Sequence, residues 1–167
     1  MLSIYEHAPA QFEHGLQNLL HLLKKAEHFL AQGAVPESQL LDARLAEDMY
    51  PLLRQVQLSC DFAKGAVSRL AGRENPVMPD EETSFAQLYQ RIENTLAYVK
   101  SFQASDFANS EQREIELQGK SYHLKMTAQK FLLAFALPNF YFHLTTAYNI
   151  LRNQGVEIGK KDFLGMS

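Results

Sequence analysis

Four long stretches of this sequence place apolar side chains at intervals of three and four residues, the spacing that forms one face of an α-helix. The first stretch runs from about Pro9 to about Ala31 and stops at Gly33. The second begins near Asp48, a favoured N-cap residue, and closes at Gly72. Because an amphipathic helix must bury its apolar face against another element, the pattern predicts a bundle of helices.

A short alternating segment separates the third and fourth predicted helices. Ser84 and Gln87 have the spacing of a capping box and open the third helix. Residues 114–126 alternate in period two, which predicts a small β-hairpin. The fourth helical segment is interrupted at Pro138 and ends at Gly155. The predicted fold class is therefore all-α, a four-helix bundle with one short hairpin before the last helices.

Each predicted helix carries one row of side chains that should face the core. The tail after Gly155 keeps four apolar side chains, so we expect it to pack on the bundle. The predicted core residues are Phe12, Leu16, Leu19, Leu23, Ala26 and Leu30 in the first helix, Met49, Leu52, Leu53, Val56, Cys60, Ala63, Val67 and Leu70 in the second, Phe85, Leu88, Ile92, Leu96 and Val99 in the third, and Phe140, Leu144, Ala147, Ile150 and Leu151 in the fourth. In the hairpin, Ile115 and Leu117 should share one face, as should Tyr122, Leu124 and Met126.

Length and composition favour one soluble domain that spans residues 1–167, with 46% hydrophobic and 21% charged residues. A net charge of -3 gives no reason to expect nucleic acid or an anionic membrane as a partner. The single cysteine excludes an intramolecular disulfide, and no signal peptide or membrane-length apolar run is present. We therefore expect a cytoplasmic protein.

Four histidines recur at every seventh residue of the first helix: His7, His14, His21 and His28. Residues at this spacing lie about 10 Å apart along a helix, too far for two imidazoles to share one ion. The row falls nearly opposite the leucine face, so we expect it to be solvated or to face a dimer partner. Leu22 and Phe29 would suit such a self-association surface, whereas Lys64 is expected to face the solvent.

His143 differs from the other histidines because it belongs to the core-facing row of the last helix. It is either a buried histidine with its nitrogens satisfied by neighbours, or a metal ligand or general base in a pocket between helices. Asn139, one turn earlier, offers an amide oxygen on the same face. On the second helix, Asp48 and Gln55 lie along one edge of the apolar face, and Asp48 offers a carboxylate. We interpret Cys60 as a small buried hydrophobic residue.

Three segments carry a resemblance to a known family: "LAEDMYPLLRQVQLSCDFAKGAVSRLAG", "DEETSFAQLYQRI" and "FALPNFYFHLTTAYNILRNQGVEIGKKDFLG". Together they resemble a bacterial family of unknown function within the DinB/YfiT-like superfamily of metalloenzymes. The resemblance implies a four-helix bundle, often a homodimer. In better-known members it also implies a nickel or zinc ion held by three histidines, and relatives include thiol-dependent transferases and isomerases.

The superfamily's ligands carry over only in part. Its last helix has the pattern His-x-x-x-His, and alignment places the second histidine on His143 and the first on Asn139. The third ligand is a histidine of the second helix, but this chain has none between His28 and His123. Either Asp48 or Gln55 substitutes for it in a weaker site, or the metal has been lost.

Two functions follow from these residues. In the first, His143 with Asn139 and Asp48 forms an interhelical pocket of a degenerate metal-dependent enzyme that acts on a small molecule or a thiol adduct. In the second, the chain is a non-catalytic small-ligand-binding protein or a structural homodimeric bundle that has lost the metal site. In that case, the segment Gly159–Gly165 or the histidine row would form an interface.

Overall fold

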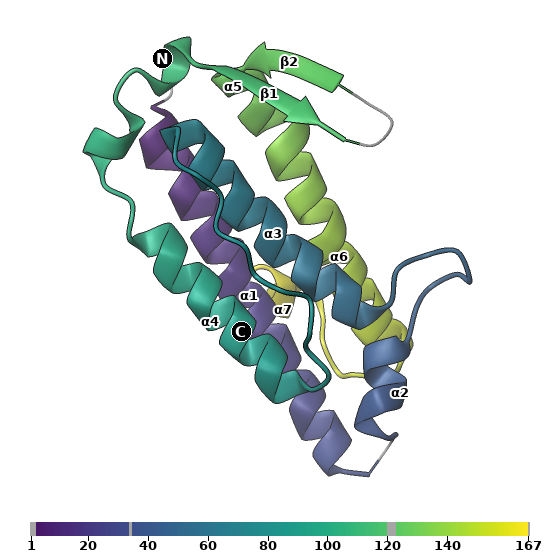
Figure 1. Ribbon diagram of the computed structural model, residues 1–167. Coiled ribbons are helices and arrows are strands. Elements are labelled where there is room, and N and C mark those ends of the chain that lie inside the picture. The colour runs from purple at the N-terminus through teal and green to yellow at the C-terminus, as the bar shows by residue number, and fades with distance from the viewer. Residues whose placement is uncertain (1–2, 34, 120–122, 167) are drawn as a thin grey trace.

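The computed structural model describes residues 3–33, 35–119 and 123–166. Four long helices lie side by side and form the bundle, as Figure 1 shows. They are α1 (Ile4–Ala31), α3 (Leu52–Ala71), α4 (Phe85–Lys100) and α6 (Leu137–Asn153). The shorter elements are α2 (Glu37–Asp42), the 3-10 turns η1 (Ala104–Phe107) and η2 (Ser110–Gln112), strands β1 (Glu114–Gln118) and β2 (His123–Thr127), α5 (Ala128–Phe131), the π-helical turn η3 (Leu132–Ala136) and α7 (Lys160–Phe163).

The core lies between the four long helices and confirms the predicted faces. The side chains predicted to face the core are buried, except Leu30, Met49 and Leu53, which are half-buried. No helix within the described residues is both long and apolar enough to cross a membrane.

The first helix starts earlier than predicted, because its N-cap is Ser3 and not a residue next to Pro9. The Ser3 hydroxyl accepts a hydrogen bond from the Glu6 backbone N–H, at 3.5 Å. Pro9 therefore lies inside the helix. Its missing N–H leaves the Tyr5 carbonyl without its usual intrahelical partner, one lost bond in a helix of 28 residues.

The second long helix starts later than predicted, so the placement of Asp48 as its N-cap is wrong. The helix begins at Leu52, with extended Pro51 (ψ 169°) at the cap position, and Asp48 lies in an exposed turn. The reason is steric, because a residue that precedes proline is pushed out of the helical region. This bias favours a start after Pro51, although the residues before Pro9 and Pro138 are helical in this chain.

The predicted capping box of α4 is confirmed with a shift of one residue. The Ser84 hydroxyl accepts from the Gln87 N–H at 3.3 Å, as expected. The Gln87 side chain reaches back one residue further and accepts from the Thr83 N–H at 2.6 Å.

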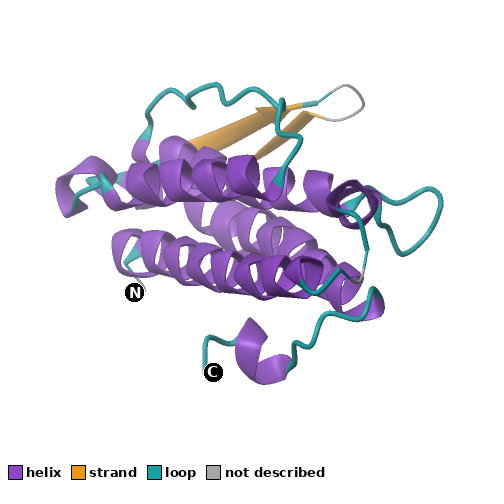
Figure 2. Cartoon of the chain, turned by 90° about the horizontal axis from the view of Figure 1, so that it is seen from below, coloured by secondary structure: helices purple, strands orange, loops and turns teal. Residues whose placement is uncertain are grey.

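The predicted hairpin is present and lies on one side of the bundle, as Figure 2 shows. Ile115 pairs with Met126 and Leu117 with Leu124 in an antiparallel register. Directly paired residues lie on the same face of a sheet, so both predicted apolar sets meet there. Tyr122 lies outside the described residues.

Helix α6 continues the path of α5 through η3. The Leu137 N–H bonds to the Leu132 carbonyl five residues earlier, which widens this turn. Pro138 follows at the second position of α6. Because proline cannot donate to an earlier carbonyl, a widened turn at this point is a local solution to a proline inside a long helix.

The tail packs against α1, on the side of the bundle opposite the hairpin (Figure 2). Val156 and Ile158 are buried, as the sequence predicts. The suggestion of an exposed interface in the segment Gly159–Gly165 is wrong for Asp162, which is 7% exposed and bonds to Lys25 of α1 at 2.5 Å.

Candidate functional site

The seam between α3 and α6 brings together two polar side chains inside the bundle. Gln55 of α3 is 1% exposed and His143 of α6 is 8% exposed. The Gln55 Oε1 atom lies 2.8 Å from His143 Nδ1, which is hydrogen-bond distance. The two residues are 88 positions apart in the sequence, so this contact exists only because α3 packs on α6.

A second hydrogen bond fixes which atom donates in this pair. The Gln55 amide nitrogen donates to the Tyr50 carbonyl at 3.0 Å, so its oxygen is the atom that faces His143. An amide oxygen only accepts, and therefore the proton resides on His143 Nδ1. No residue in the described ranges makes a hydrogen bond with Nε2. In the neutral ring, Nε2 carries an available lone pair.

Aromatic rings enclose the imidazole of His143. Phe62 stacks on it at 5.4 Å between centroids and 19° between planes, and Phe142 meets it edge-on at 5.2 Å. Burial, together with the positive charge of Arg54, lowers the pKa of His143 to about 4. The ring is therefore neutral at physiological pH.

The donor set around His143 does not fit the three-ligand metal site that the resemblance implies. Asn139 turns its amide nitrogen to the Phe135 carbonyl of its own helix, at 2.7 Å. Asp48 lies in the exposed turn before α3. Gln55 is the one member of the predicted set that meets His143, and it does so through a direct hydrogen bond. Within the described residues, His, Cys, Asp and Glu side chains form no group of three that suits an ion.

Cys60 of α3 is fully buried, as predicted. Burial raises the pKa of the Cys60 thiol to about 12. A thiol in this state is not the reactive thiolate, so Cys60 acts as a packing residue.

Almost the whole chain is similar to known proteins. Residues 4–164 match the family described as "Domain of unknown function (DUF1993)". The chain belongs to this family. Its structure is similar to the crystal structure of a DinB family member protein from Shewanella denitrificans, with 43% sequence identity and a TM-score of 0.88. The match covers 97% of this chain and 92% of that chain, and it confirms the predicted resemblance and the DinB-like fold. Among curated proteins, none matches.

A cavity of about 380 Å³ lies next to the histidine in this DUF1993 chain. His143 does not line it, but Phe62 both stacks on His143 and forms part of the cavity wall. The full lining comprises Leu58, Asp61, Phe62, Lys64, Ala66, Arg69, Asn75, Pro76, Val77, Met78, Leu117, Phe131 and Phe135. The sequence analysis did not predict this cavity. Phe131 and Phe135 are one helical turn apart, and this spacing could have indicated an aromatic surface on one helix face.

The prediction that Lys64 faces the solvent is wrong. Its side chain is 4% exposed and its ammonium donates to the Pro76 carbonyl at 2.5 Å. The segment 73–83 covers this part of α3 and removes Lys64 from water. A helical periodicity cannot reveal such a cover, because the covering residues follow no helical pattern.

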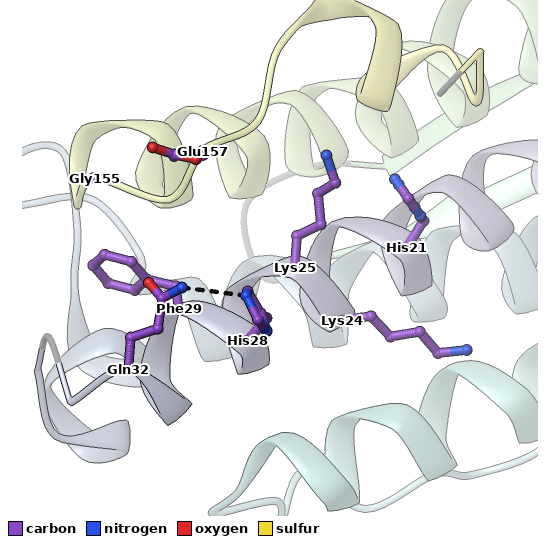
Figure 3. A pocket seen from close by; sticks show the side chains of 8 residues that line it. All are labelled: His21, Lys24, Lys25, His28, Phe29, Gln32, Gly155 and Glu157. Carbon is purple, nitrogen blue, oxygen red and sulfur yellow. Dashed lines mark hydrogen bonds between the residues drawn. The ribbon is translucent and has the colours of Figure 1, made fainter.

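A second cavity of the DUF1993 chain, of about 450 Å³, lies between α1 and the tail (Figure 3). Figure 3 shows Lys25 extending toward the tail while Lys24 points away from it. Lys25 is paired with Asp162, and the Gln32 amide donates to His28 at 3.2 Å. Glu157 adds a negative charge on the opposite wall.

Most of the histidine row is exposed, as expected, but its neighbourhood is partly covered by the tail. His21 lies 3.3 Å from Asp162 of the tail, while His7, His14 and His28 are exposed. Leu22 is fully buried, so it cannot belong to a self-association surface. Phe29 is half-buried and lies beside Gly155 of the tail. The C-terminal segment therefore covers part of the face that the sequence suggested for a partner.

Proposed function

We propose that this DUF1993 protein binds a small molecule in the seam between α3 and α6 without a metal ion. In this proposal, the Nε2 lone pair of His143 accepts a hydrogen bond from the ligand, and Phe62 and Phe142 supply apolar contact. The observation that carries the proposal is the hydrogen bond between His143 Nδ1 and Gln55, whose direction the Tyr50 carbonyl fixes. This bond holds the ring in the tautomer with the proton on Nδ1. The acceptor nitrogen, Nε2, then points away from Gln55.

The metal-dependent enzyme receives less support from the same residues. Asp48 lies in an exposed turn, and within the described residues no group of three His, Cys, Asp or Glu side chains suits an ion. Metal-free base catalysis is also disfavoured, because a general base works best with a pKa near the operating pH and burial holds His143 at about 4. A low pKa suits a hydrogen-bond acceptor that stays neutral.

The homodimer stays a prediction for this protein. Leu133 is 53% exposed and Phe142 is 58% exposed, and both belong to the η3–α6 segment. Large apolar side chains on a surface are a typical feature of protein interfaces. Sedimentation velocity would measure the oligomeric state directly.

The proposal is tested with two ligands that differ in one hydrogen-bond donor, phenol and its methyl ether anisole. Only phenol donates a hydrogen bond, so we expect wild-type protein to bind phenol about two- to tenfold more tightly. In His143→Phe, which keeps a ring but lacks Nε2, this preference should disappear. Equal binding of both ligands by the wild type, or a preference that survives in His143→Phe, would contradict the proposal.

Metal content is measured alongside by elemental analysis of untagged wild type and His143→Ala. We expect no nickel or zinc that depends on His143. A near-stoichiometric ion in the wild type that is lost in His143→Ala would overturn the metal-free proposal and restore the enzyme hypothesis.

A further inference from the structure

The cavity beside the His143 seam has walls from three separate parts of the chain. Helix α3 lines one side, and residues 75–78 of the segment before α4 line a second. The far wall comes from Leu117 of β1 and from the two phenylalanines Phe131 and Phe135. A volume of about 380 Å³ lies within the range of small-molecule sites in proteins.

A row of aromatic rings connects this cavity with His143. Phe62 stacks on His143 and lies 6.1 Å from Phe135, measured between ring centroids. Phe135 in turn stacks with Phe131 at 5.9 Å and 24°. Three of these rings face the cavity, so a flat ring inside it would meet aromatic faces and edges at favourable contact distances.

The charged side chains of the lining already have polar partners within the protein. Asp61 accepts from Arg91 at 2.9 Å, and Lys64 donates to the Pro76 carbonyl. Arg69 donates to the Gly65 carbonyl at 2.9 Å. A charged ligand would lose its hydration on entering and would have to compete with these bonds for a partner.

We propose that this cavity binds an uncharged, planar aromatic molecule whose ring packs against Phe62, Phe131 and Phe135. This inference goes beyond the proposed function, because it concerns a cavity that His143 does not line. Neither the family nor the crystal structure reported above assigns a ligand here.

The test uses three probes that share one ring system and differ in charge: indole is neutral, indole-3-acetate is an anion and tryptamine is a cation. The chain contains no tryptophan, so indole fluorescence reports the ligand alone. At neutral pH, we expect indole to bind at least tenfold more tightly than either charged analogue. Equal affinities, or a preference for indole-3-acetate or tryptamine, would overturn the uncharged class.

The place of binding is read from methyl NMR of the methionines, which needs no variant. Met78 lines the cavity, whereas Met49 belongs to the turn before α3 and does not. A ring bound in the cavity should shift the Met78 methyl signal and leave that of Met49 unchanged. Indole that binds without moving Met78 would place the site elsewhere and overturn the inference.

A matched pair of alanine substitutions adds an independent check. Ala66 lines the cavity and is 2% exposed, while Ala97 is an exposed residue of α4. Ala66→Leu should fill the cavity and abolish indole binding, and Ala97→Leu should leave it unchanged. Binding that survives in folded Ala66→Leu would contradict the inference. If Ala66→Leu fails to fold, the Met78 signal of the wild type decides alone.

The two proposals fail in different ways. If indole moves Met78 but the phenol preference does not depend on His143, the cavity stands and the role of His143 fails. If the phenol preference depends on His143 but indole leaves Met78 unmoved, the proposed function stands and the present inference fails.

Discussion

At the scale of single residues, Gln55 determines the chemical state of His143. A buried imidazole is neutral when its environment penalises charge, but burial alone leaves both tautomers open. Gln55 removes this choice, because its amide nitrogen is bonded to the Tyr50 carbonyl and only its oxygen is left for Nδ1. A backbone carbonyl that precedes α3 thus sets the hydrogen-bonding role of a side chain on α6.

The lowered pKa of His143 predicts a pH dependence of stability. Its value of about 4 in the folded protein lies below an ordinary unfolded value of about 6.5, so the unfolded state binds more protons between these two values. The free energy of unfolding should therefore fall as the pH drops from 6.5 to 4, by at most about 1.4 kcal/mol per pH unit.

Urea denaturation across this pH range checks the prediction, with His143→Gln as the control. Glutamine does not titrate and still offers an amide N–H to Gln55. As the pH falls, the wild type should lose more unfolding free energy than His143→Gln does. Parallel pH profiles for the two proteins would contradict a lowered pKa at His143.

At the scale of elements, one glycine allows α1 and α6 to approach closely. A Cβ atom at Gly15 would lie 2.4 Å from Cε1 of Phe140, a ring that is fully buried and packs edge-on against Phe12. The ring has no room to withdraw, because interiors are close-packed. Glycine is unfavourable inside helices, so its place in α1 reflects the packing of α6 and not the preference of α1 itself.

Two glycine-to-alanine substitutions separate overpacking from helix propensity. Gly15→Ala should lower the free energy of unfolding by about 1–3 kcal/mol, because overpacking outweighs the gain in helix propensity. Gly65→Ala in α3 should change it by less than about 1 kcal/mol, because the added methyl meets the far ends of two flexible side chains, Arg69 and Asn75, and no packed ring. Thermal unfolding of both variants measures the difference. A Gly15→Ala variant as stable as the wild type would show that Phe140 can move aside.

At the scale of the whole molecule, a buried arginine fastens the segment 73–83 across the bundle. The Arg91 side chain is 2% exposed and bonds at 2.9 Å to Asp61 of α3 and to Asp80 and Glu82 of the segment. Burial would raise the pKa of Glu82, but the hydrogen bonds from Arg91 and Gln57 outweigh it and lower this pKa. The contribution of Glu82 to stability is therefore present at neutral pH and is lost as the pH falls through its lowered pKa.

This network predicts unequal effects for two arginines that contact the same carboxylate. Arg91→Met removes a buried cation from three carboxylates, of which Glu82 is only 13% exposed, and should cost about 3–5 kcal/mol of unfolding free energy. Arg54→Met removes a more exposed partner of Asp80 and should cost less than about 1 kcal/mol. Chemical denaturation compares the two variants. Similar costs would indicate that Arg91 does not anchor the segment more firmly than Arg54.

The sequence by itself determined the helices, their buried faces and the family resemblance. It also placed His143 in the core and Cys60 as a packing residue. These features depend on periodicity and on local caps, which act between residues a few positions apart. The tertiary structure decided which side chain meets His143. Sequence reasoning left Asp48 and Gln55 as alternatives. Helix α3 starts after Pro51, which leaves Asp48 in an exposed turn and Gln55 as the partner.

Tertiary structure also decided which surfaces are covered. Lys64 is buried under the segment 73–83, and Leu22 is fully buried in the folded chain although the sequence suggested an exposed position for both. Irregular segments leave no periodic trace in the sequence, and their positions are set by distant groups such as Arg91 and Asp162. The cavity beside His143 arises in the same way, because helix α3, a loop and a π-helical turn meet there only after the chain has folded.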